Sequence, residues 1–254
     1  MLRFSFLLPK GLVIIKTDIL GVFFDNLTMD EAVENALELM KSKGAAYVVT
    51  PNPEIVMLCR ENPALAAAVN QASMVLADGI GVVYGAKILS SPMKEKVPGI
   101  DFAQNLMAKM SEKHMSVYLL GAKPGVAEAA AENLSTRFEG LEILGTHNGY
   151  FTDDAPIIEE INTLSPDLLL VCLGAPKQEL WMQQNRAKLS LGLMAGLGGS
   201  LDVFAGVVER APEKWQKLGL EWLYRLKQDP SRLGRMKVLP KFVFAVMGQR
   251  FKRK

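Results

Sequence analysis

Short apolar runs alternate with amphipathic stretches along most of the chain. The runs end at polar or glycine-rich turns and occupy residues 45–49, 74–77, 117–120, 141–144, 168–173 and 191–195. Apolar runs of this length are typical of strands buried on both faces. Between them the apolar positions recur at helical spacing, at 29–41, 54–71, 80–89, 101–113, 124–138, 155–164 and 176–188. The pattern therefore predicts strands and helices in alternation.

This alternation predicts an α/β fold, a Rossmann-like parallel sheet with helices on both faces. Neither an internal repeat nor a Ser/Gly-rich linker divides it, so we place the only boundary near Ala211-Pro212. The predicted units are an α/β domain at 1–211 and a helical C-terminal appendage at 212–254. Pro9 and Lys10 split the apolar residues near the N-terminus, and no small-residue cleavage site follows. We therefore expect an N-terminal extension there and not a signal peptide.

Composition narrows the class of protein. The chain has 254 residues, of which 49% are hydrophobic and 22% charged, enough for a large core and unlike disordered, collagenous or coiled-coil proteins. No segment approaches the roughly 20 apolar residues that a membrane-spanning helix needs. The two cysteines, Cys59 and Cys172, are far apart in apolar surroundings. They indicate neither a disulfide scaffold nor a thiolate metal site, and a cytoplasmic setting is expected.

The charge is unevenly distributed. Residues 214–254 hold twelve Lys and Arg against two acidic residues, whereas the first 213 residues hold 17 basic and 25 acidic ones. A basic tail on an acidic body suggests an anionic partner, such as phospholipid, nucleic acid or a phosphate-bearing substrate.

The tail also carries apolar side chains. From Pro212 an amphipathic helix is predicted, with apolar positions at Trp215, Leu218, Trp222, Leu223 and Leu226. A second segment contains the apolar run 242–247 and ends in four cations, at 250 and 252–254. This combination favours peripheral binding to an anionic membrane surface, because the run is more apolar than nucleic-acid binding requires. The alternative is a helix pair packed on the body with solvated cations.

The turns after the predicted strands contain the candidate chemistry, because ligands of open α/β sheets bind beyond the carboxyl ends of the strands. Several turns carry glycine and lead into helices, which suits a diphosphate and hence a nucleotide. The carboxylate of Asp78 would repel a pyrophosphate. A role as the base that takes a proton from a hydroxyl group therefore fits Asp78 better. The six turns lie at 50–54, 78–81, 121–125, 147–151, 174–179 and 196–200.

Two other classes of function stay open at this point. Gly79 and Gly81, followed by Gly85, approximate a dinucleotide fingerprint and so a NAD-dependent oxidoreductase, but the third glycine comes one residue late. A membrane or nucleic-acid adaptor would use the basic tail alone and leaves the polar strand ends unexplained. The chain has no Asp-x-Asp motif, so a nucleotide diphosphate would be neutralised by Arg, Lys and helix ends and not through a metal ion.

Five motifs in fixed order resemble the WecG/TagA/CpsF glycosyltransferases, over roughly residues 20–235. They are Thr-Pro-Asn-Pro-Glu at 50–54, Ala-Asp-Gly-Ile-Gly at 77–81, Val-Pro-Gly-Ile-Asp at 97–101, Leu-Gly-Ala-Pro-Lys-Gln-Glu at 173–179 and Gly-Gly-Ser-Leu-Asp at 198–202. The basic tail resembles the C-terminal appendage of the TagA branch.

The resemblance implies an inverting, metal-independent transfer that needs no cofactor. N-acetylmannosamine would move from its UDP donor to the 4-hydroxyl of N-acetylglucosamine on undecaprenyl diphosphate, in synthesis of the wall teichoic acid linkage unit. Members of the family use other UDP-hexose donors too, and no residue here distinguishes among these sugars.

The resemblance also suggests roles for residues at the strand ends. Asp78 would be the general base that takes the proton of the acceptor hydroxyl. Thr50 and Asn52 would bind the donor sugar or its phosphates, beside the turn of Gly79 and Gly81. The nucleotide would be held by Gln178 and Asp202.

Cations would complete the site. Lys96 stands where the family has Arg, which keeps the charge but loses the bidentate fork. Arg225, Arg232 and Arg235 match arginines of the appendage and would close over the diphosphate of the leaving UDP. Away from a membrane the tail is expected to be mobile or to self-associate, so a second copy of the chain is a further expected partner.

Overall fold

The computed structural model describes residues 5–7, 13–230 and 233–252. Arg232 and most of the predicted N-terminal extension therefore lie outside the described residues. The side chain of Arg235 is also outside the description, as are those of residues 1–14.

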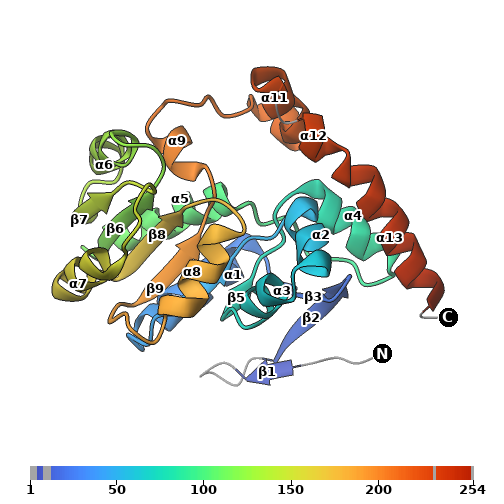
Figure 1. Cartoon of the computed structure of the whole chain (residues 1–254), viewed down its shortest axis with the longest axis horizontal. Coiled ribbons are helices and arrows are strands. Elements are labelled where there is room, and N and C mark those ends of the chain that lie inside the picture. Colours follow the sequence, from blue (N-terminus) through green and yellow to red (C-terminus); the bar gives the residue numbers. More distant parts are fainter. Residues whose placement is uncertain (1–4, 8–12, 231–232, 253–254) are drawn as a thin grey trace.

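The centre of the molecule is a six-stranded parallel sheet in the order β5-β4-β9-β8-β6-β7 (Figure 1). Each strand falls on one of the six predicted apolar runs, which confirms that part of the sequence analysis. Because all the strands are parallel, their carboxyl ends meet at one edge. The strands are β4 (Ala46–Val49), β5 (Met74–Val75), β6 (Ser116–Gly121), β7 (Glu142–His147), β8 (Leu168–Cys172) and β9 (Leu193–Gly196).

Helices cover both faces of the sheet, so the predicted fold class is confirmed. Successive residues of a strand enter opposite cores, as Val48 and Val49 do in β4. One face is covered by α1 (Met29–Met40), α5 (Gly99–Ser111), α6 (Val126–Arg137) and α9 (Ser200–Phe204). The other carries α2 (Pro53–Glu61), α3 (Pro63–Asn70), α4 (Ile80–Ile88), α7 (Ala155–Leu164) and α8 (Lys177–Asn185).

The helix predicted at 54–71 is two helices. Pro63 lacks the backbone N–H that a continuous helix would need and begins α3 instead. Asn62 ends α2 and caps α3, since its side chain accepts a hydrogen bond from the backbone N–H of Leu65.

A second, antiparallel sheet near the N-terminus was not predicted. It consists of β1 (Ser5–Leu7), β2 (Val13–Ile19) and β3 (Val22–Asp25). Leu20 and Gly21 join β2 to β3 with positive φ angles of 55° and 88°. Asp25 ties this sheet to the main one, because its buried carboxylate accepts a hydrogen bond from the backbone N–H of Val75, 2.8 Å away.

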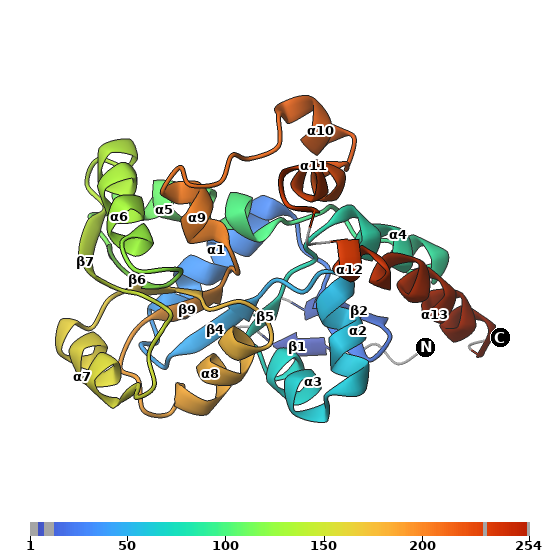
Figure 2. The ribbon, with the colours of Figure 1, turned by 45° about the horizontal axis from the view of Figure 1, so that its top comes forward.

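The appendage contains α10 (Glu213–Lys217), α11 (Glu221–Gln228), α12 (Leu233–Met236) and α13 (Val238–Lys252). The single amphipathic helix predicted from Pro212 was wrong: the chain breaks at Gly219, whose φ is 70°. Neither α10 nor α11 has a buried residue. A β-carbon at Gly219 would lie 3.1 Å from Ile80 of α4, so this glycine lets the start of α11 approach the body closely. The connection between α10 and α11 therefore lies against the start of α4, and Figure 2 shows α13 running past α2 and α4.

Helix α13 is apolar on two sides. Phe242 and Val246 are buried against the body, while Phe244, Met247 and Phe251 are exposed. In the part of the chain that the structure describes, no helix has the length and apolar character to cross a membrane.

Candidate active site

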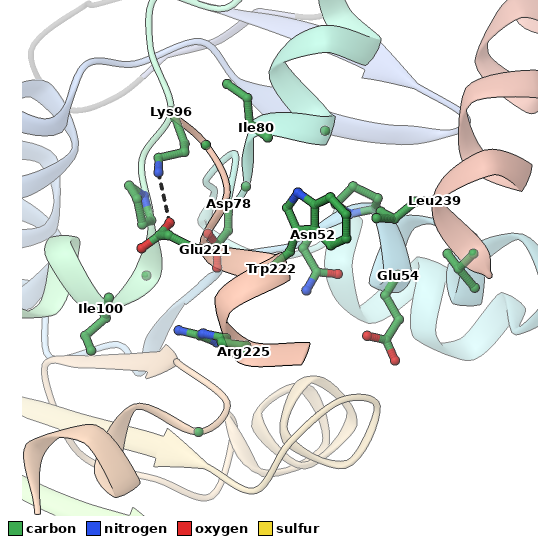
Figure 3. A pocket seen from close by; sticks show the side chains of 18 of the residues that line it. Asn52, Glu54, Asp78, Ile80, Lys96, Ile100, Glu221, Trp222, Arg225 and Leu239 are labelled. Carbon is green, nitrogen blue, oxygen red and sulfur yellow. Dashed lines mark hydrogen bonds and ion pairs between the residues drawn. The ribbon is translucent and has the colours of Figure 1, made fainter. Parts of the chain in front are cut away.

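A pocket lies where three neighbouring strands, β5, β4 and β9, end. The loops after these strands form its floor, and the appendage forms the opposite wall through α11 and the start of α13 (Figure 3). Its volume is about 190 Å³, below the roughly 300–1,000 Å³ usual for ligand sites, so a large substrate would extend out of it. Its charged lining residues are Glu54, Asp78, Lys96, Glu221 and Arg225, and its polar and aromatic ones include Asn52, Ser200 and Trp222.

Asp78 follows β5 and sits inside the pocket, half-buried. Burial raises the pKa of its carboxyl group to about 6, and the nearby Glu221 carboxylate adds to the shift. Arg225, Lys96 and the backbone N–H of Gly99 lower that pKa without cancelling the effect of burial. A carboxylate that titrates near 6 is still mostly ionised at pH 7 and is a stronger base than an ordinary aspartate, which suits general base catalysis.

Ion pairs connect the body to the appendage beside Asp78. Lys96 Nζ lies 3.1 Å from Glu221 Oε2 on α11 (Figure 3). Arg210, in the segment before α10, pairs with Asp101 of α5 at 2.6 Å and lies 3.8 Å from Glu221. All four side chains are between 21% and 29% exposed, so solvent screens these contacts less than contacts at an open surface.

Comparison with known proteins fits this arrangement. The family model described as "Glycosyl transferase WecG/TagA/CpsF family" matches residues 17–254. The chain belongs to the WecG/TagA/CpsF family. Proteins from Staphylococcus aureus strains MW2 and NCTC 8325 / PS 47 are 38% identical to it over 234 residues, which is 91% of this chain and 92% of each relative. Both are named N-acetylglucosaminyldiphosphoundecaprenol N-acetyl-beta-D-mannosaminyltransferase.

Membership of this glycosyltransferase family decides between the two enzyme classes that the sequence left open, against the oxidoreductase. Two of the three glycines behind that alternative are required by packing, and the third by its backbone conformation. A β-carbon at Gly81 would lie 2.6 Å from Pro53, and one at Gly85 would lie 3.0 Å from Phe242. Gly79 has a φ of 86° and is the N-cap of α4.

Six of the residues that we selected from the sequence line the pocket of this family member. They are Asn52, Asp78, Gly79, Gly81, Lys96 and Arg225. They come from segments up to 173 positions apart in the chain. Their roles toward a substrate remain predictions.

Three others, Thr50, Gln178 and Asp202, do not line the pocket. The buried hydroxyl of Thr50 donates to the carbonyl of Gly196, 3.1 Å away, and so ties the end of β4 to the end of β9. Gln178 accepts a hydrogen bond from the backbone N–H of Gly198 at 2.9 Å. Both side chains thus hold the loops that carry the pocket, and their predicted contacts with the donor would require the ligand to reach beyond it.

Three further residues at or beside the pocket were not predicted from the sequence: Glu221, Trp222 and Arg210. Glu221 was only one of two acidic residues in a basic tail, and Trp222 was part of an expected apolar face. Their positions depend on contacts across the fold, such as the pairing of Glu221 with Lys96, 125 residues away. No local pattern could have indicated them.

Within the described residues, no group of three or more His, Cys, Asp or Glu side chains is placed to hold a metal ion.

Proposed function

We propose that this protein transfers N-acetylmannosamine from UDP-N-acetylmannosamine to the 4-hydroxyl of N-acetylglucosamine on undecaprenyl diphosphate, the product being the linkage unit of wall teichoic acid. The names of the Staphylococcus aureus relatives support the sugar and the lipid-linked acceptor. The reaction is an inverting single displacement that requires no metal ion.

Asp78 acts as the base in this reaction. Its carboxylate accepts the proton of the acceptor hydroxyl while that oxygen attacks the anomeric carbon from the side opposite to UDP. The bond from the anomeric carbon to the phosphate oxygen breaks, and the negative charge develops on the diphosphate. Lys96 and Arg225 line the same pocket and offset this charge.

A single observation carries the proposal: a basic carboxylate and two cations, one of them from the appendage, meet in one pocket of a chain in this glycosyltransferase family. General base and charge stabilisation are the two elements that a metal-free displacement of UDP needs. Arg232 and Arg235, whose side chains lie outside the described part of the structure, would be further cations for the diphosphate, as the family resemblance suggests.

We further propose that the appendage, residues 212–254, places the protein on the inner face of the cell membrane, where the lipid-linked acceptor resides. The outward apolar stripe of α13, formed by Phe244, Met247 and Phe251, supports this proposal. Phe244 and Phe251 are 73% and 68% exposed. Lys241, Arg250 and Lys252 lie on the same helix and are exposed. Apolar side chains flanked by cations favour adsorption to an anionic leaflet.

The test is incubation of the full chain with a short-chain lipid diphosphate N-acetylglucosamine acceptor and a panel of UDP-sugars, with and without a chelator. With the N-acetylmannosamine donor, mass spectrometry should show that the acceptor has gained the mass of one N-acetylhexosamine. The rate of this transfer should be the same with and without the chelator. Transfer of a different sugar would correct the donor. Absence of transfer, or dependence on a metal ion, would overturn the mechanism.

A further inference from the structure

The charges of the described pocket lining do not suit a diphosphate as they stand. The carboxylates of Asp78 and Glu221 already balance the two described cations of the lining, Lys96 and Arg225. A diphosphate brings at least two more negative charges, and like charges held close together in a partly desolvated site repel strongly. Either additional cations must arrive or one carboxylate must withdraw.

Among the carboxylates of the lining, Glu221 is the one that could move out of the pocket most easily. Asp78 and Glu54 are attached to the body, on the loop after β5 and on α2, whereas Glu221 begins α11 of the appendage. Helix α11 has no buried side chain to fix it, and Gly219 precedes it with a φ of 70°. The Glu221 carboxylate is held at the pocket by its ion pairs with Lys96, at 3.1 Å, and with Arg210, at 3.8 Å.

The ion pair of Lys96 and Glu221 also lies inside the pocket. Lys96 stands directly before the Val-Pro-Gly segment that leads into α5, and its ammonium group is aimed into the pocket at Glu221 (Figure 3). A carboxylate and a phosphate oxygen bind an ammonium group through the same kind of charge-assisted hydrogen bond. The Glu221 carboxylate thus fills the position at Lys96 that a phosphate would take.

We infer that Glu221 is an internal stand-in for a substrate phosphate: it neutralises Lys96 in the free protein, and a phosphate of a diphosphate-bearing substrate displaces it. The inference rests on the proposed function for the substrate class, but it concerns binding and not transfer. Arg210, 3.8 Å from Glu221 and already paired with Asp101, is positioned to receive the released carboxylate. Displacement would also shift α11, and with it Arg225.

The experiment compares Glu221→Gln with the wild-type chain by isothermal titration calorimetry. The probes are inorganic pyrophosphate, UDP and geranyl diphosphate, of which the last two distinguish the donor's diphosphate from the acceptor's. Glu221→Gln should bind pyrophosphate and at least one of the others about 10-fold more tightly, equivalent to about 1.4 kcal/mol. The gain should shrink at high salt, since it is electrostatic.

Glu213→Gln is the matched control, because it removes the same charge from an exposed ion pair with Lys217 on neighbouring α10. It should leave all three affinities unchanged. Lys96→Gln should weaken pyrophosphate binding and abolish the gain when combined with Glu221→Gln. Unchanged or weaker binding by a folded Glu221→Gln would overturn the inference and make the ion pair purely structural. Because these readouts do not involve sugar transfer, failure of the proposed reaction would be seen separately.

Discussion

Phe242 of α13 packs directly against Gly85 of α4, where a β-carbon would stand only 3.0 Å from the ring's Cζ. The absence of a side chain at Gly85 lets the two helices approach, and Phe242 is only 2% exposed. The C-terminal helix is therefore part of the hydrophobic core and not only a surface attachment.

Replacing Phe242 should destabilise the whole protein. Phe242→Ala leaves a cavity between α13 and α4, so we expect the free energy of unfolding to fall by about 3–5 kcal/mol, measured by urea denaturation. Phe244→Ala, two residues away and 73% exposed, should change it by less than about 0.5 kcal/mol. Equal effects of the two changes would contradict the packing described here.

The outward stripe of α13 should decide membrane binding. Phe244→Asp removes an exposed apolar side chain and adds a charge that anionic lipid repels, so cosedimentation with vesicles containing phosphatidylglycerol should fall about 10-fold or more. Val207→Asp is the control, because Val207 is 63% exposed but lies outside the appendage, and this variant should leave cosedimentation unchanged. Undiminished binding by Phe244→Asp would remove α13 from the proposed membrane contact.

Arg225 should act on the leaving group. Arg225→Gln leaves the developing charge on UDP less compensated, so kcat should fall by about 10- to 100-fold. Lys227→Gln removes a cation from the same helix without altering the pocket lining, and its kcat should stay within about two-fold. If both variants lost the same activity, the effect would belong to the net charge of α11 and not to the position of Arg225.

Ionisation of Asp78 should lower the free energy of unfolding. Its pKa is about 6 in the folded protein against an ordinary value of 3.8, so the folded state holds the proton more tightly than the unfolded state. This loss of stability is fully developed above pH 6, and it disappears as the pH falls below about 4. Asp78→Asn should therefore raise the free energy of unfolding at pH 7.5 by about 1–3 kcal/mol, the upper figure corresponding to the full difference between the two pKa values.

Denaturation of wild type and Asp78→Asn at pH 7.5 and at pH 4 checks this sign. The difference should be complete at the higher pH and should fall to about a fifth of that value at the lower one. A variant that is less stable than the wild type at pH 7.5 would mean that Asp78 is held by favourable contacts and that its pKa is not raised.

The parallel sheet could be predicted from the sequence because its strands are buried on both faces and so appear as continuous apolar runs. The antiparallel sheet escaped prediction for two reasons. Its β2–β3 turn is formed by Leu20 and Gly21, whereas such turns usually show Asn-Gly or Asp-Gly. The strand β2 also begins within the first fifteen residues, which were interpreted as an extension.

The site was predictable where it lies on strand ends and unpredictable where it depends on the appendage. Asp78 and Asn52 follow apolar runs, so topology alone brings them to one edge of the sheet. Glu221 and Trp222 reach the pocket only because Gly219 breaks the expected helix. The helical spacing of the tail's apolar residues indicated one continuous helix and concealed that break.

The turnover of Asp78→Asn as a function of pH tests the central claim most directly. The wild-type kcat should rise with pH through a midpoint near 6, as Asp78 loses its proton. Asp78→Asn should bind UDP with unchanged affinity yet lose about 10²- to 10⁴-fold in kcat together with that pH dependence. A folded Asp78→Asn with wild-type turnover, or one that keeps the transition near pH 6, would show that another group accepts the proton.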